Sequence, residues 1–427
     1  MKIKEIKNTA KRHKTLLSNF SYMSVLQVFV LLTPLITYPY LTRVLGTELF
    51  GLVITAQVLA TYATIVVKFG FDAVSARHIS IWRDDCLKLT EVMSSILTMR
   101  ILLWIASLFI YTAVVLMVPV YRQHLWLFIF SYGLTLNVLM FPQFFFQGIE
   151  RMKYITYINI GIQTIFIILT FIVIRTPEDY LFVPLLHAIG YFLGGIAALY
   201  IIYKGYNLTF KIPTKAQLVY YFKDAFPLFA TDAVCTIKDR LGYLLLGIFV
   251  SMGDVVIYDI GSKLTSLAIQ PLTIINTVIF PKMAKDKNNS LFLKFGLVII
   301  AAIAALVLLI NIFLSPIVHF LIGKEVSLLP IRIFLLSPIF LGLGSYIGSC
   351  LIVARGYNKY MFYSILITTS AYILSLLLVF FTDNANKVES FIAMTVIAYF
   401  VEMLYRLFVS HKILVTSFKN IEKNEIR

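Results

Sequence analysis

Residues 91–118 read EVMSSILTMRILLWIASLFIYTAVVLMV, a mostly apolar stretch with only two charged side chains. An α-helix rises about 1.5 Å per residue, so about 20 predominantly apolar residues cross a hydrocarbon core about 30 Å thick. The stretch therefore predicts a membrane-spanning helix.

Similar stretches recur along the 427 residues, of which 60% are hydrophobic and 14% are charged. Soluble domains have roughly 45–50% apolar and 25% charged residues. The stretch nearest the N-terminus, residues 16–40, lacks a small-residue cleavage site, which predicts a helix that is not removed as a signal peptide. We predict an all-α integral membrane protein with twelve transmembrane helices, at residues 16–40, 49–67, 91–118, 125–146, 154–174, 180–203, 224–250, 255–280, 291–322, 330–353, 360–381 and 389–411.

Basic residues are distributed unevenly between the two sides. With the N-terminus inside, 26 of the 37 Lys and Arg fall in predicted cytoplasmic segments and 5 in external ones. This positive-inside pattern predicts that both termini are cytoplasmic. The net charge of +16 is then explained by contact with anionic inner-leaflet lipids rather than nucleic acid. The three cysteines and six histidines show no ligand spacing, so neither a metal site nor a disulfide framework is predicted.

A polar link at residues 204–223 separates six predicted helices from the next six. Such a division is typical of transporters built from two related halves. We predict an N-terminal lobe at residues 1–205 and a C-terminal lobe at 206–427.

Four charged residues interrupt the apolar stretch 226–250. Charged groups inside a bilayer are costly and usually face a bundle interior or a water-filled cavity. At 100° per residue, one helix face holds Asp232, Thr236, Asp239 and Arg240, whereas Lys238 lies apart.

The next predicted helix repeats the pattern with a polar arc of Asp259, Lys263, Ser266 and Gln270. Arg240 and Lys263 both lie about 15 Å from the external turn that joins the two helices. Bases outnumber acids within the spans, which favours an anionic ligand such as phosphate.

The candidate residues fall into three groups. The substrate ligands predicted from charge are Arg240, Lys263, Lys238 and Arg100. The candidates for coupling to an ion, H⁺ or Na⁺, are Asp232, Asp239 and Asp259. The predicted polar lining is Gln57, Thr61, Asn159, Gln163 and Gln270.

Each charged candidate also has a structural alternative. Asp232 and Asp239 could pair with Arg240, and Asp259 could form a self-contained pair with Lys263. Arg100 and Arg332 could extend to the membrane interface. Glu402 and Arg406, four residues apart, are expected to neutralise each other.

Several motifs resemble one family of membrane proteins. The stretches YPYLTRVLGTELFGLV (38–53), FGFDAVSARHISIWRDDCLKLTEV (69–92), FPQFFFQGIERMKYITYINIGIQ (141–163) and YLLLGIFVSMGDVVIYDIGSKL (243–264) are similar to the polysaccharide flippases that carry O-antigen or capsule repeat units. These flippases belong to the multidrug/oligosaccharidyl-lipid/polysaccharide exporter superfamily. The resemblance covers nearly the whole chain in order.

The resemblance implies a bacterial inner-membrane protein that moves an undecaprenyl-pyrophosphate-linked oligosaccharide by alternating access of two six-helix lobes around a cationic cavity. It adds Arg43, from LTRVLG, to the candidate substrate ligands, and glycan polymerase machinery as a possible partner. The chain lacks the G-x-x-x-x-G-K-[ST] loop that binds ATP phosphates, so we expect a transporter without a cofactor, driven by an ion gradient or by the substrate's own gradient.

Two alternatives involve other functions. A polymerase or glycosyltransferase of the same pathway needs catalytic residues outside the membrane, but the predicted external turns are short. A multidrug exporter of organic cations is expected to have an acidic rather than a basic cavity. A lipid II flippase is chemically closer, but that branch usually has two more helices.

Overall fold

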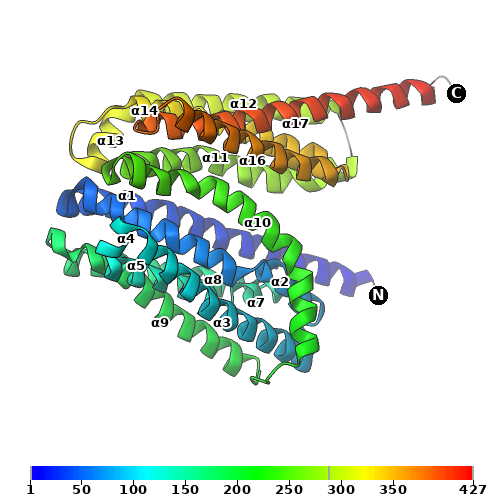
Figure 1. The fold of residues 1–427 in the computed structure, drawn as a ribbon. Helices are drawn as coiled ribbons and strands as arrows, with labels where there is room; N and C mark the ends of the chain where they lie inside the picture. Colours follow the sequence, from blue (N-terminus) through cyan, green and yellow to red (C-terminus); the bar gives the residue numbers. More distant parts are fainter. Residues whose placement is uncertain (1, 287–288, 426–427) are drawn as a thin grey trace. The chain divides into compact units, whose positions relative to one another are not determined.

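The computed structural model describes the backbone of residues 2–286 and 289–425, in which all regular structure is helical (Figure 1). Side chains are described for residues 17–415 apart from 274, 277, 278, 281, 282 and 286–288. Each of the twelve predicted spans overlaps this helical structure. The elements are α1 (Lys2–Lys68), α2 (Phe71–Ile81), α3 (Cys86–Met117), α4 (Pro119–Gln123), α5 (Leu125–Tyr132), η1 (Gly133–Thr135), α6 (Leu136–Met140), α7 (Gln143–Gly148), α8 (Met152–Val173), η2 (Pro177–Leu181), α9 (Phe182–Gly205), α10 (Lys215–Phe249), α11 (Met252–Asp286), α12 (Asn289–Ile312), α13 (Leu314–Ile322), α14 (Leu329–Phe334), α15 (Ser337–Ile347), the π-helix η3 (Gly348–Val353), α16 (Asn358–Phe381) and α17 (Val388–Glu425).

Nine helical runs among the described residues are long and apolar enough to cross a membrane, from Leu17–Ile81 to Val388–Val415. The helices that carry most of the predicted site, α10 and α11, are each 35 residues long and lie outside these nine. The prediction of a multi-pass all-helical protein is confirmed. The number twelve and the side on which the termini lie stay predictions.

A glycine divides α1 into the two helices expected from its sequence. Gly46 has φ 74° and ψ 165°, outside the helical region. Glycine adopts positive φ readily because it has no Cβ. The break lies between the predicted spans 16–40 and 49–67.

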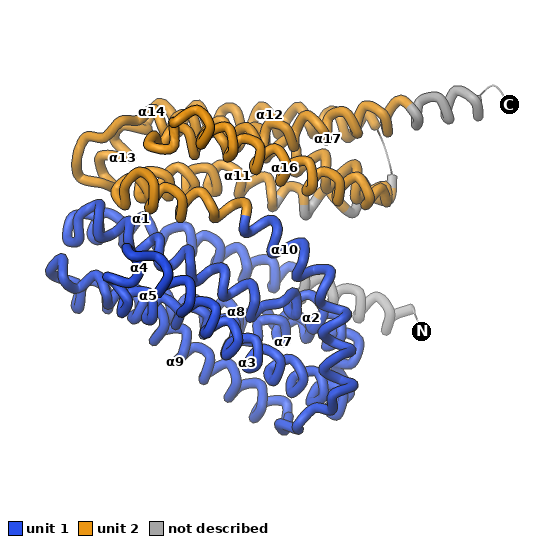
Figure 2. Tube along the Cα trace, in the orientation of Figure 1, with its two compact units in different colours: residues 1–237 blue, residues 238–427 orange. Residues whose placement is uncertain are grey.

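The chain forms two compact units, residues 1–237 and 238–427 (Figure 2). Within each unit the long helices lie side by side, for example α8 against α9 and α16 against α17. The division falls inside α10, beyond the polar link. The predicted lobe boundary at residues 205/206 stays a prediction.

Two of the family-like motifs contribute to the buried core of the first unit. Helix α2 packs against α7, where Phe144, Phe145 and Phe146 are all fully buried. A Cβ on Gly148 would lie 2.6 Å from Cγ2 of Ile79, so only glycine allows the two helices to approach this closely.

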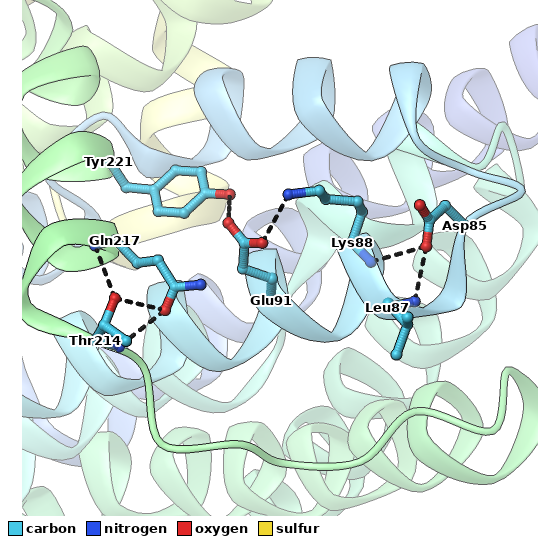
Figure 3. A network of polar contacts seen from close by, with 7 residues as sticks. All are labelled: Asp85, Leu87, Lys88, Glu91, Thr214, Gln217 and Tyr221. Atoms are coloured by element: carbon cyan, nitrogen blue, oxygen red, sulfur yellow. Dashed lines mark hydrogen bonds and ion pairs between the residues drawn. The ribbon is translucent and has the colours of Figure 1, made fainter.

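Polar contacts connect the start of α10 to the start of α3 (Figure 3). Asp85 caps α3 by accepting hydrogen bonds from the backbone N–H groups of Leu87 and Lys88. Glu91, one turn further on, accepts hydrogen bonds from Lys88 Nζ at 3.0 Å and from Tyr221 Oη at 3.4 Å. These contacts position the first part of the helix that carries the candidate site.

Candidate functional site

Asp232, on the part of α10 that belongs to the first unit, has its partner on α1. Its Oδ2 lies 3.5 Å from Lys68 Nζ, and the two side chains are 49% and 40% exposed. Exposed ion pairs hold their partners weakly, typically by about 1 kcal/mol or less. The alternative in which Asp232 pairs with Arg240 is replaced by this contact with Lys68.

Asp239 also binds a different partner from the one expected. Lys238 Nζ lies 3.1 Å from Asp239 Oδ1, and Tyr399 Oη donates a hydrogen bond to the same oxygen at 3.1 Å. The ammonium of Lys238 lies 4.8 Å from the centre of the Tyr399 ring. The helical-face argument placed Lys238 apart, but its flexible four-carbon stem brings the charge back to its neighbour.

Arg240 and Lys263 are connected through two residues between them. The Arg240 guanidinium lies 5.6 Å from the centre of the Tyr243 ring. Tyr243 Oη donates a hydrogen bond to Asp259 Oδ1 at 3.1 Å, and Asp259 also forms an ion pair with Lys263. The second unit thus joins predicted residues of α10 and α11 in one cluster, which we name the cationic cluster: Arg240, Tyr243, Asp259 and Lys263.

The charges in the cationic cluster are unequally satisfied. Asp259 is only 5% exposed, whereas the Lys263 side chain is 42% exposed. The alternative pairing of Asp259 with Lys263 is therefore present, although it is not self-contained, because Tyr243 also donates a hydrogen bond to Asp259. No described carboxylate lies within ion-pair distance of Arg240, which is partly exposed. The cluster consequently has one cation without a carboxylate and can accept an anion by charge-assisted hydrogen bonds.

Arg100 lies elsewhere and has a different environment. Its side chain is fully buried, Nη2 donates to Asp72 Oδ1 at 2.5 Å, and Nη1 donates to the Val138 carbonyl at 2.6 Å. The expectation that Arg100 extends to the membrane interface is wrong, because the arginine is held inside the first unit by a carboxylate on α2. We leave Arg100 out of the proposed site, since its contacts fix α3 to its neighbours.

The remaining candidates are dispersed. Arg43 is exposed near the break in α1, and Arg332 is exposed on α14. Thr61 and Asn159 donate side-chain hydrogen bonds to carbonyls of their own helices, at Gln57 and Ile155. Gln57, Gln163 and Gln270 are partly buried. No described contact gathers these polar residues into one lining, so that role stays a prediction.

Glu402 and Arg406 form the ion pair expected from their spacing. Both lie on α17, with side chains 14% and 7% exposed, and Arg406 Nε also donates to Ser364 Oγ at 2.9 Å. The pair is structural and links α17 to α16.

The sequence-based site omitted three residues that complete these contacts. Tyr243 follows Arg240 by three positions, so helical spacing could have indicated it. Lys68 directly follows the predicted span 49–67 and is 164 residues from Asp232, so no local pattern predicts their ion pair. Tyr399 is 160 residues from Asp239, and nothing local predicts their contact.

The fold is that of membrane flippases and exporters. It is similar to the lipid II flippase MurJ in an inward closed conformation, with TM-score 0.70 and 16% identity, covering 90% of this chain and 86% of that one. It is also similar to an inward-facing multidrug resistance MATE family transporter of the MOP superfamily, with TM-score 0.68 and 12% identity, covering 94% and 99% of the two chains. At these identities the similarity shows the fold.

Sequence similarity shows the family to which the chain belongs. Residues 16–287 match the polysaccharide biosynthesis protein family, and the chain belongs to it. A putative O-antigen transporter of Escherichia coli K12 is 26% identical over 376 residues, which are 85% of this chain and 88% of the relative. A putative O-antigen transporter of Shigella dysenteriae is 25% identical over 335 residues, 77% and 84% of the two chains. These relatives are transporters, and the predicted class of protein, a transporter rather than an enzyme, is confirmed.

Proposed function

We propose that this protein moves an undecaprenyl-diphosphate-linked oligosaccharide from the inner to the outer leaflet of the bacterial inner membrane by alternating access. Family membership and the putative O-antigen transporters support this class of substrate. The observation that carries the proposal is the cationic cluster, in which Arg240 has no described carboxylate partner.

The chemistry of the cluster suits a diphosphate. A guanidinium presents a planar fork of N–H donors that matches two phosphate oxygens. Lys263 is ion-paired with Asp259 but half-exposed, so its ammonium can turn toward an arriving anion. Asp259 would neutralise Lys263 while the substrate is absent and leave the positive charge of Arg240 available to it.

Coupling to a gradient is part of the proposal. Asp232, Asp239 and Asp259 each contact a lysine, at Lys68, Lys238 and Lys263. A carboxylate that exchanges its partner for H⁺ or Na⁺ would link ion movement to transport. We further propose twelve spans, cytoplasmic termini, two lobes at residues 1–205 and 206–427, and contact with glycan polymerase machinery.

Translocation by the purified protein tests the function. Vesicles that contain only this protein receive a fluorescent lipid-linked oligosaccharide, and the fraction that reaches the opposite leaflet is measured by quenching from outside. We expect transfer that exceeds protein-free vesicles and falls in the Arg240→Ala variant. Equal transfer with and without protein would contradict the proposal.

A multidrug exporter is the second candidate, because the fold is also that of a MATE family transporter. Uptake of an organic cation such as ethidium into the same vesicles distinguishes the exporter from the flippase. Uptake of ethidium without transfer of the lipid-linked sugar would favour the exporter.

A further inference from the structure

A pocket of about 440 Å³ lies in the second unit, between α11 and the helical run of α15 and η3. Helix α11 contributes Thr273, Asn276 and Phe280, and the facing run contributes Ser345, Ser349 and Val353. We name it the hydroxyl pocket. None of these six side chains is ionisable, in contrast to Asp259 and Lys263 of the cationic cluster, which lie on the same helix α11.

The backbone beside the pocket is unusual. Ser349 and Val353 lie on η3, a π-helix from Gly348 to Val353. π-Helical turns inside α-helices are rare and occur frequently at functional sites, because the extra residue redirects neighbouring side chains. Here the irregular turn brings Ser349 to the wall of the pocket.

The side-chain amide of Asn276 forms only long hydrogen bonds with the described residues around it. Its side chain is only 7% exposed, and Nδ2 lies 3.5 Å from Ser345 Oγ, at the limit of a hydrogen bond. Among the described residues, its Oδ1 accepts a weak hydrogen bond from Cys350 Sγ, at 3.9 Å. An amide offers two donors and an acceptor, and burying such groups without good partners is costly.

We propose that the hydroxyl pocket binds a neutral sugar ring of the transported oligosaccharide, an inference that rests on the proposed function. The Asn276 amide and the hydroxyls of Ser345 and Ser349 would exchange hydrogen bonds with sugar hydroxyl groups. Phe280 offers an apolar surface to the carbon side of the ring. Binding sites for small molecules combine apolar walls with a few polar groups in this way.

The distance from the cationic cluster fits a glycan that carries its diphosphate at one end. Thr273 follows Lys263 by ten residues, which is about 15 Å along α11. The two positions differ by about 80° around the helix, so the glycan would run obliquely along α11. Charge and neutral hydrogen bonding would thus recognise different ends of one substrate.

Binding to two probes tests this assignment. The first probe is lipid-linked oligosaccharide extracted from the source organism, and the second is undecaprenyl diphosphate without sugars. We expect the purified wild type to bind the first more tightly. Asn276→Leu should weaken binding of the first about tenfold, the equivalent of roughly one to two hydrogen bonds, and leave binding of the second unchanged.

Two further variants complete the experiment. Asn311→Leu is the matched control, at a partly buried asparagine of α12 that donates a hydrogen bond to the Val307 carbonyl of its own helix, and it should bind both probes as the wild type does. Ser349→Ala removes a single oxygen from the pocket and replaces Asn276→Leu in the binding test if that variant does not fold. Equal loss for both probes, or no loss for either, would overturn the pocket assignment. A wild type that binds neither probe would overturn the proposed function as well.

Discussion

Arg240 is the residue for which charge and environment point most directly to a ligand. Its guanidinium contacts the Tyr243 ring at 5.6 Å and has no described carboxylate within ion-pair distance. We expect Arg240→Ala to lower surface glycan about 10- to 100-fold, the equivalent of a hydrogen bond to a charged group. Arg240→Lys should retain part of the activity, because it keeps the charge but loses the fork.

Surface glycan in a strain without its own flippase measures this effect, with the amount of protein in the membrane as the control. Normal surface glycan in Arg240→Ala cells would remove Arg240 from the substrate site.

For Glu402 and Arg406 we predict an effect on the stability of the protein rather than on substrate binding. Glu402→Gln leaves the Arg406 guanidinium, 7% exposed, without its carboxylate. Breaking a buried pair in this way costs about 3–5 kcal/mol. The double variant Glu402→Gln with Arg406→Gln removes both charges and should be much milder, in stability and in transport.

Thermal unfolding of the detergent-solubilised proteins compares the three forms. If the single variant unfolds at the temperature of the wild type, the pair does not hold α17 to α16 as described.

Residue spacing predicted some of these contacts and missed others for a simple reason. Pairs four positions apart on one helix, such as Asp259 with Lys263, follow from helix geometry alone. The partner of Arg100 is Asp72, on another helix, and the partner of Asp239 includes Tyr399. Those contacts depend on how helices pack, which a local pattern does not contain.

At the scale of elements, the contact of α2 with α7 depends on one glycine. Because a Cβ at position 148 would lie 2.6 Å from Ile79 Cγ2 and 2.9 Å from the Ala76 carbonyl oxygen, Gly148→Ala must push the backbones apart. We expect a loss of about 1–3 kcal/mol in unfolding free energy. Gly161→Ala in α8 is the matched control, since nothing lies within 4 Å of the added carbon and alanine favours helix.

Denaturant titration of both variants checks this prediction. Gly148→Ala with unchanged stability would show that α2 and α7 are packed less closely than described.

The elements themselves follow from the sequence because membrane-spanning length and apolar composition are local properties. All twelve predicted spans overlap helices, and the break of α1 falls at Gly46. The π-helix after α15 could not be predicted, because its residues GSCLIV resemble any apolar helical turn. The hydroxyl pocket, which η3 lines, could therefore be found only from the structure.

At the scale of the whole molecule, the predicted orientation rests on the positive-inside pattern, and the structure shows which single residues are exposed and can report it. Cys86 is exposed, whereas Cys350 is buried. The pattern places Cys86 on the cytoplasmic side and the turn that holds the exposed Glu325 outside. A variant with Cys235→Ser and Cys350→Ser keeps Cys86 alone, so labelling of that thiol reports the orientation of the chain.

We expect a membrane-impermeant maleimide to leave this variant unlabelled in spheroplasts and to label it after lysis. Adding Glu325→Cys in a background with Cys86→Ser should reverse the result, giving label before lysis. The two positions lie in different compact units, so agreement between them would fix the direction of both units with one reagent. Labelling of Cys86 in intact spheroplasts would invert the topology and place the hydroxyl pocket at the external end of α11, where a glycan leaves rather than enters.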